Sequence, residues 1–161
     1  FRRVLFRSEY THLGFSKQRS RFNDTTGTIV LDQKAKTGSA DIAISVTSVD
    51  TGSKAFDGHL ISSNWFDADI YPNITFKSNQ FKFKGDKPTE VIGELTVRGI
   101  TKPVTLKVTH FHCAMHPMKQ KEACGANAVT HIKRSEFGLG KYAPNVSDEV
   151  ELTIAVEAVK E

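Results

Sequence analysis

The sequence has no long apolar run and none of the short motifs that signal common enzyme chemistry. No apolar stretch approaches the ~20 residues that a helix needs to cross a bilayer, so we expect no membrane span. The chain contains no GxSxG, HExxH or GxGxxG motif and no Walker loop. We therefore expect neither an enzyme nor a bound cofactor.

The chain also has almost no excess of positive over negative charge once the first eight residues are set aside. These residues, FRRVLFRS, match the translation of a common sequencing adapter. We interpret residues 1–8 as non-native and expect that the natural start, with any signal peptide, was lost. Without Arg2, Arg3 and Arg7, 19 of the 22 basic residues remain against 18 acidic ones, and the net charge falls from +4 to +1. This balance provides no electrostatic case for binding nucleic acid or an anionic membrane surface.

The dominant pattern in the sequence is an alternation of apolar and polar residues with a period of two. The 161 residues, 39% hydrophobic and 25% charged, fit a single globular domain over residues 9–161. In residues 40–49 and 150–158, apolar and polar side chains alternate as in half-buried strands. Further strands are expected near 12–22, 28–32, 74–84, 91–98, 103–111 and 126–133.

Nearly all of the connections between these eight segments are short. Turn residues at 50–52, 85–88 and 98–101 leave no room for parallel crossovers, so the strands should form an antiparallel meander. Eight long strands favour a closed barrel, whose interior can hold one small ligand. The expected fold is therefore an all-β, antiparallel, eight-stranded barrel.

One segment follows a helical period instead. From Phe56 to Tyr71 the apolar residues are spaced by four, one, four, one and four. Asp57 or Ser62 is the expected cap at its start, and Pro72 forbids continuation. We predict a short helix across one mouth of the barrel, with Trp65 and Phe66 as a lid over the lumen.

Alternation and side-chain bulk together predict which residues face the lumen. A ligand could be bound there by apolar contact alone, although the same side chains could instead fill the barrel. The predicted wall comprises Ile42, Ile44, Val46, Ile74, Phe76, Phe81, Phe83, Leu95, Val97, Val104, Leu106, Val108, Ile154 and Val156. His12 and Arg134 are candidate partners for a polar head group.

A cluster of cysteine and histidine admits more than one interpretation. Cys113 and Cys124 are close enough in sequence for a local disulfide, which would imply an oxidising compartment. Alternatively, His110, His112 and His116 could join the two sulfurs in a zinc or copper site, and the protein would then be metal-binding or redox-responsive. Two unrelated free thiols are the third possibility.

Seven short segments carry a family resemblance: HLGFSK at 12–17, GTIVLD at 27–32, SVDTG at 48–52, HLISSNWFD at 59–67, YPNITF at 71–76, GELTVRGITKPVTL at 93–106 and RSEFGLG at 134–140. In this order they resemble the YceI family from about Glu9 to the end of the chain. Each segment is weak alone, but seven in order are specific.

The resemblance implies a lipocalin-like barrel in a periplasmic or secreted protein. It also implies a lumen that binds an isoprenoid or another chain lipid, such as a polyisoprenoid, a quinone or a fatty-acid-like amphiphile. A homodimer is possible. The family's first strand normally precedes HLGFS, where this chain has the adapter-like residues, so we expect a truncated first strand and an open barrel seam.

Overall fold

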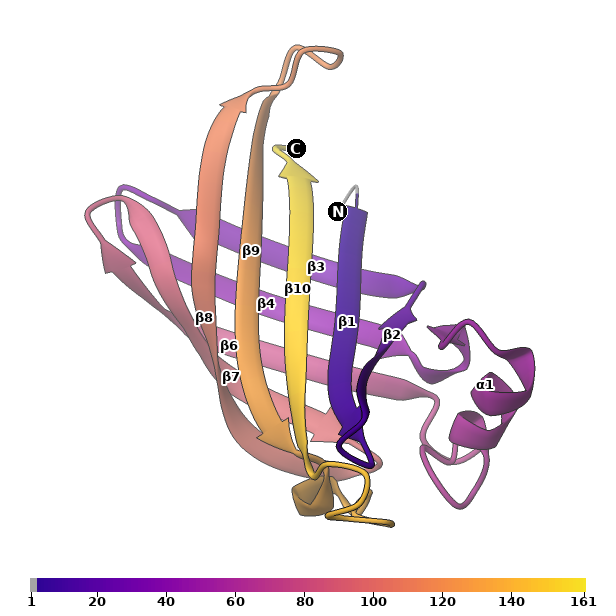
Figure 1. The fold of residues 1–161 in the computed structure, drawn as a ribbon. Helices are drawn as coiled ribbons and strands as arrows, with labels where there is room; N and C mark the ends of the chain where they lie inside the picture. The colour runs from indigo at the N-terminus through magenta and orange to yellow at the C-terminus, as the bar shows by residue number, and fades with distance from the viewer. Residues whose placement is uncertain (1–2) are drawn as a thin grey trace.

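The computed structural model describes residues 3–161, which form one antiparallel sheet of ten strands curled into a half-barrel (Figure 1). A single α-helix, α1 (Lys54–Ile61), and two short 3-10 turns, η1 (Val46–Ser48) and η2 (Arg134–Phe137), complete these residues. The strands are β1 (Arg3–His12), β2 (Ser16–Phe22), β3 (Thr25–Asp32), β4 (Thr37–Ser45), β5 (Val49–Asp50), β6 (Asn73–Lys84), β7 (Lys87–Val97), β8 (Ile100–Met115), β9 (Glu122–Lys133) and β10 (Glu149–Val159).

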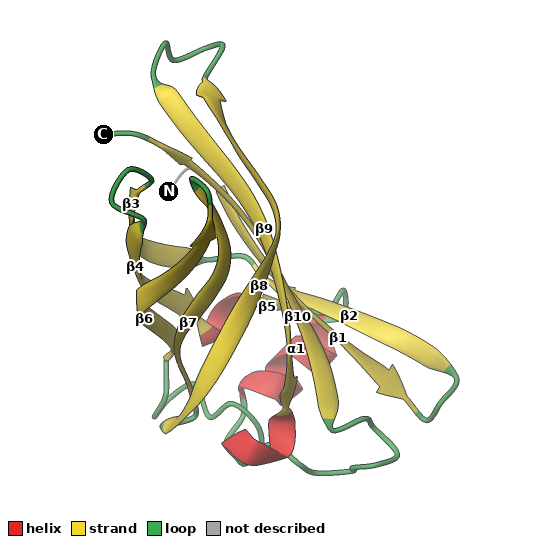
Figure 2. Cartoon of the chain, turned by 90° about the vertical axis from the view of Figure 1, so that its left-hand side faces the viewer, coloured by secondary structure: helices red, strands yellow, loops and turns green. Residues whose placement is uncertain are grey.

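The strands follow the order β3-β4-β6-β7-β8-β9-β10-β1-β2-β5 across the sheet. Seen from the side, β3, β4, β6 and β7 face β8, β9, β10 and β1 (Figure 2). The sheet edges meet at one corner, where Asn23 N donates to Ser48 O at 3.1 Å and Ser45 N donates to Asp24 O at 3.0 Å. The predicted all-β, antiparallel, lipocalin-like fold with one short helix is confirmed, with ten strands in place of eight.

The two additional strands are β1 and β5. β5 has only two residues, and β1 includes residues that were set aside as non-native. Residues Arg3 to Glu9 pair with Glu157 to Glu151 of β10, and Phe6 is buried in edge-to-face contact with Phe22. The place beside β10 that was expected to be open is therefore filled. That residues 1–8 are non-native stays a prediction, and residues 1–2 lie outside the described part of the chain.

The helix begins earlier than its sequence pattern predicts. Ser53 caps its start by accepting a hydrogen bond from Phe56 N, and Ser62 lies at its end, so both predicted caps were wrong. Asp57 instead accepts hydrogen bonds from Thr51 N at 2.8 Å and Thr51 Oγ1 at 2.6 Å. These two bonds tie the first turn of α1 to the segment that follows β5.

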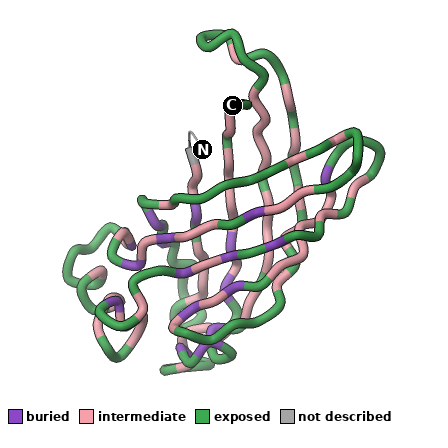
Figure 3. The backbone as a smooth tube through the Cα atoms, turned by 180° about the vertical axis from the view of Figure 1, so that it is seen from behind, coloured by how far each residue is buried: buried purple, intermediate pink, exposed green. Residues whose placement is uncertain are grey.

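The buried core lies at the end of the half-barrel where α1 and η2 sit (Figures 1 and 3). Its most buried side chains are Val46 and Phe137, each 1% exposed. The β8–β9 hairpin extends beyond the rest of the sheet and carries no buried residue at its tip. Side chains therefore fill one end of the fold and leave the other end free to form a cavity. None of the helices within residues 3–161 has the length and apolar character needed to cross a membrane.

Candidate functional site

The concave face of the sheet encloses a cavity of about 960 Å³. Side chains from β1, β3, β4, β6, β7, β8, β9 and β10 line it, and most of them are Val, Leu, Ile, Phe or Ala. Among the described lining residues, the charged ones are confined to the mouth: Asp32, Glu122, Lys160 and Glu161. An apolar interior with a polar opening suits a ligand that has a greasy body and a polar end.

The structure places ten of the predicted wall residues around this cavity. They are Ile42, Ile44, Phe76, Phe81, Leu95, Val104, Leu106, Val108, Ile154 and Val156. Ile74 and Val97 have the parity of the lining residues on β6 and β7, and Val46 lies in η1. All three are buried in the core and do not line the cavity. Phe83 is half-buried and is not among the lining residues. Alternation identified the inner face of these strands, and it could not distinguish the packed end of that face from the hollow end.

Several lining residues were missed for identifiable reasons. Val4 and Phe6 were excluded with residues 1–8, although they alternate as β1 requires. Phe111 lines the cavity because the β8–β9 register shifts between Val108 and His110, which moves the inward face from even to odd positions. The apolar sequence Val108, Phe111 carries this change of phase, and it is the one signal that could have revealed the bulge.

Trp65 and Phe66 close the packed end of the barrel and do not form a lid over the cavity. Phe66 packs edge to face on Phe22 at 5.9 Å between ring centres. Trp65 Nε1 donates to His59 Nε2 at 2.8 Å, and its ring lies 6.1 Å from that of Tyr142. Both side chains contact the buried core rather than the lumen, because the turns after α1 fold back over β2 and the 138–148 loop.

Arg134 is a structural anchor and not a head-group ligand. Its Nε donates to Ser147 O at 2.9 Å, its Nη2 to Val146 O at 2.7 Å, and its Nη1 to the carbonyls of Lys141 and Leu139. Burial lowers the pKa of the guanidinium, while the nearby Asp148 and Tyr10 act in the opposite direction. Every nitrogen of the side chain is thus committed to holding the 138–148 loop.

His12 also lies away from the cavity. It ends β1, is exposed, and forms an isolated bridge with Val146 of the 138–148 loop. The cavity opens at the opposite end of β1, near Val4. Neither predicted head-group residue is therefore placed at the cavity mouth.

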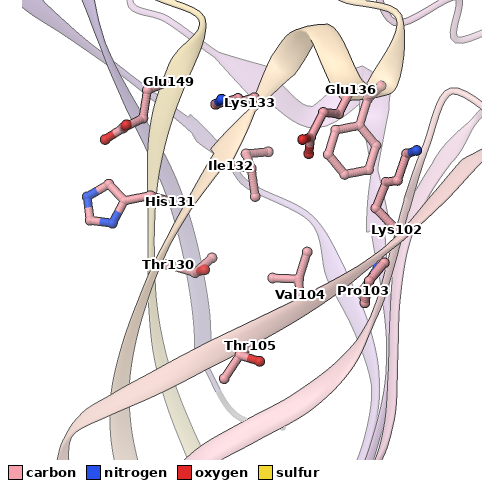
Figure 4. Close-up of a pocket in the computed structure, with 11 residues that line it drawn as sticks. Lys102, Pro103, Val104, Thr105, Thr130, His131, Ile132, Lys133, Glu136 and Glu149 are labelled. Atoms are coloured by element: carbon pink, nitrogen blue, oxygen red, sulfur yellow. The ribbon is translucent and has the colours of Figure 1, made fainter.

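A second, smaller cavity of about 420 Å³ opens through the wall of the half-barrel (Figure 4). It lies where β8 and β9 diverge, since β9 pairs with β8 only as far as Val129, opposite Lys107. Val104 and Thr130 line both cavities, so this side window adjoins the lumen. Lys102, Lys133, Glu136 and Glu149 surround its outer side.

The predicted disulfide is present. Cys113 and Cys124 face each other on β8 and β9 with an S–S distance of 2.04 Å, and neither sulfur is free to bind a metal. His110 and His112 are exposed. Within residues 3–161, no three His, Cys, Asp or Glu side chains are grouped closely enough to hold one metal ion.

Comparison with known proteins gives one consistent result. Residues 3–158 match the YceI-like domain. Protein YceI of Shigella flexneri is 36% identical over 151 residues, which cover 93% of this chain and 78% of that protein.

Solved structures have the same fold. BcnA of Burkholderia cenocepacia superimposes with a TM-score of 0.82 at 27% identity, covering 96% of both chains. A domain from Saccharophagus degradans, described as polyisoprenoid-binding and implicated in plant cell wall breakdown, has a TM-score of 0.73 at 15% identity and covers 98% of this chain and 94% of its own. At that identity the likeness concerns the fold alone. The family match over nearly the whole length shows that this chain belongs to the YceI family.

Proposed function

We propose that this protein binds an apolar chain lipid in its lumen and carries or sequesters it. The observation that carries the proposal is the apolar cavity of about 960 Å³, open at one end. Its volume lies at the upper end of the roughly 300–1,000 Å³ range of small-molecule sites. A long, narrow lipid uses such a lumen better than a compact polar ligand does.

The wall alone supplies enough free energy for binding. Each buried CH2 group contributes ~0.8 kcal/mol, so a twenty-carbon chain offers ~16 kcal/mol before the association cost of ~4 to 15 kcal/mol is subtracted. Affinity therefore requires no dedicated polar contact. A polar head group would stay at the mouth, near Asp32, Gln33 and Glu122, and would not enter the apolar interior.

A polyisoprenoid is the ligand class we favour over a quinone or a fatty-acid-like amphiphile. The wall is built largely from branched and aromatic side chains, which suit a methyl-branched chain. The Saccharophagus degradans domain with this fold is described as polyisoprenoid-binding, which supports the same class.

The proposed role is that of a binding protein rather than an enzyme. Catalysis would need a nucleophile or an acid–base pair that faces the ligand. The described residues that line the lumen include no histidine, and Cys124 is held in the disulfide. The same disulfide supports a periplasmic or secreted location, because disulfides persist in oxidising compartments.

Native mass spectrometry of the purified protein tests this function. We expect co-purified lipid, or uptake of geranylgeraniol, a twenty-carbon prenyl alcohol. Ala128→Trp, which adds bulk inside the lumen, should reduce this uptake at least tenfold. Asn127→Trp is the matched control, because Asn127 directly precedes Ala128 on β9 and its side chain is exposed on the outer face.

Empty wild-type protein that does not take up the prenyl alcohol would overturn the proposal, as would equal uptake by Ala128→Trp. The same spectra report bound metal and show whether the chain forms a homodimer.

A further inference from the structure

Four segments surround the mouth of the lumen and together form a rim. They are the three turn regions 32–37, 84–87 and 116–122 and the last two residues, 160–161. Gln33 Nε2 donates to Asp86 O at 3.1 Å and joins the first two segments. Lys160 N donates to Glu122 O at 2.9 Å and joins the last two. Asp32, Gln33, Glu122, Lys160 and Glu161 line the cavity, so three of the segments border one opening. The 84–87 turn adjoins this opening through the Gln33–Asp86 hydrogen bond and through Pro88, which follows the turn and lines the cavity.

The mouth rim concentrates positive charge. Each of its three turn regions carries two lysines and a single acidic residue. All seven rim lysines are exposed: Lys34, Lys36, Lys84, Lys87, Lys119, Lys121 and Lys160. Within the described residues, Lys160 is the one rim lysine with an ion pair, at 3.6 Å from Glu122. The rim holds seven of the chain's 22 basic residues and four of its 18 acidic ones, which leaves the remainder close to neutral.

One pairing within the rim costs stability. Lys84 and Lys87 are direct cross-strand partners at the end of the β6–β7 hairpin. Like charges placed opposite each other destabilise a hairpin, so this position is not optimised for folding. Such departures from local rules are expected where a surface serves a function.

Exposed apolar side chains lie among these lysines. Met118 is 83% exposed and Met115 65% exposed at the β8–β9 hairpin, and Val30 is 57% exposed on β3. The hairpin tip is held by its own hydrogen bonds, with His116 N donating to Lys121 O at 2.7 Å, and by the Cys113–Cys124 disulfide, two residue pairs below the last strand pair, Met115 and Glu122. The rim thus presents apolar and cationic groups together on an ordered hairpin.

We propose that the mouth rim docks on the surface of an anionic lipid bilayer. The lysines would contact lipid head groups while Met115 and Met118 enter the interface, a combination of basic and apolar groups that favours membrane surfaces. This inference rests on the proposed function, because docking by the mouth lets a chain lipid pass between bilayer and lumen without crossing water. The near-balanced charge of residues 9–161 conceals this local excess, which the sequence alone did not reveal.

Vesicle sedimentation tests the proposal. The probes are vesicles of phosphatidylcholine alone and vesicles with 30% phosphatidylglycerol. The rim variant replaces Lys34, Lys36, Lys119 and Lys121 with Glu. The control variant replaces Lys54, Lys77, Lys107 and Lys141 with Glu, which gives the same net charge at exposed sites outside both cavities.

We expect the wild type to bind the anionic vesicles and to bind less as salt rises. Each lysine near an anionic surface strengthens partitioning roughly fivefold, so the rim variant should lose binding by a factor on the order of several hundred. The control variant should retain most of its binding. In the wild-type background, Met115→Ser combined with Met118→Ser should also weaken binding to the anionic vesicles, but it should leave the salt dependence of binding unchanged.

Three results would overturn the proposal: equal binding of the wild type and the rim variant to anionic vesicles, equal losses in the rim and control variants, and wild-type protein that ignores the vesicles. The last result would leave the rim to a protein partner. Uptake of geranylgeraniol added in detergent is measured in parallel. If the rim variant still takes up the prenyl alcohol, the loss lies in docking and the proposed function stands.

Discussion

Gly38 and Phe81 occupy complementary space in the wall of the lumen. A Cβ atom on Gly38 would lie 2.3 Å from Cδ2 of Phe81 and 2.6 Å from its Cγ, so the ring covers the backbone where β4 has no side chain. Phe81 lines the cavity. The ring can leave this position only by moving toward the lumen or by disturbing the sheet.

Gly38→Ala should therefore destabilise the protein by about 1–3 kcal/mol, the usual range for overpacking. Chemical denaturation measures the loss. Gly38→Ala combined with Phe81→Leu should recover part of it, because the pair is in direct contact. Gly58→Ala serves as the control, since nothing lies within 4 Å of its added Cβ and alanine favours the helix α1. Equal effects of Gly38→Ala and Gly58→Ala would contradict the proposed packing.

Arg134→Lys should destabilise the protein by about 2–4 kcal/mol, because a lysine cannot replace a planar fork that serves four carbonyls. Uptake of geranylgeraniol by the folded variant should be unchanged. Arg98→Lys is the control, since that side chain donates to only two carbonyls, Ser63 O at 3.0 Å and Gly138 O at 3.4 Å. A stable Arg134→Lys protein with impaired uptake would instead restore the head-group role.

Removal of the disulfide by Cys113→Ala and Cys124→Ala should cost about 3 kcal/mol in the chain-entropy account of a short loop. The urea midpoint with and without reductant measures this cost. Reductant should lower the midpoint of the wild type and leave that of the double variant unchanged. A midpoint that does not respond to reductant in the wild type would show that the hairpin is stable without the bond.

Asp148 should make stability depend on pH. Ser135 Oγ donates to it at 2.6 Å and Ser135 N at 2.8 Å, and these hydrogen bonds, led by the hydroxyl, lower the pKa of its carboxyl. A carboxyl whose pKa is lower in the folded than in the unfolded protein stabilises the fold at pH values above its ordinary pKa of about 4. This contribution is lost as the pH falls through the folded-state pKa.

Unfolding free energy measured from pH 6 to pH 3 should therefore fall less steeply for Asp148→Asn than for the wild type. Some slope should remain, because hydrogen bonds from Arg19 and Asn23 lower the pKa values of Glu9 and Asp50 in the same direction. An unchanged slope in Asp148→Asn would rule out this contribution.

The inward face of the sheet was predictable where the alternation is unbroken. Ile42 and Ile44 on β4, and Ile154 and Val156 on β10, line the cavity as their parity predicts. Prediction failed at the bulges, because an extra residue reverses the face of everything after it, as it does for Phe111. The alternation therefore predicts which residues of a strand face inward only as far as the next β-bulge.

Side-chain roles at the ends of the barrel were less predictable. Arg134 was predicted as a partner for a lipid head group, yet its partners are carbonyls up to 13 residues away in the chain. Trp65 has the spacing of a helical face but packs where the turns after α1 fold back. Both roles depend on which segments meet in space, and a sequence pattern does not contain that information.

The sequence by itself determined the β class and the short helix, because each follows from residues near one another in the chain, and it offered a local disulfide as one of three interpretations of Cys113 and Cys124, which the structure then decided. Only the tertiary structure decided where apolar side chains fill a core and where they leave a hollow, and which lysines gather around its mouth. Alternation places a side chain on one face of a strand, but the curl of the whole sheet sets the distance between opposing faces. That distance makes one end solid and the other a cavity.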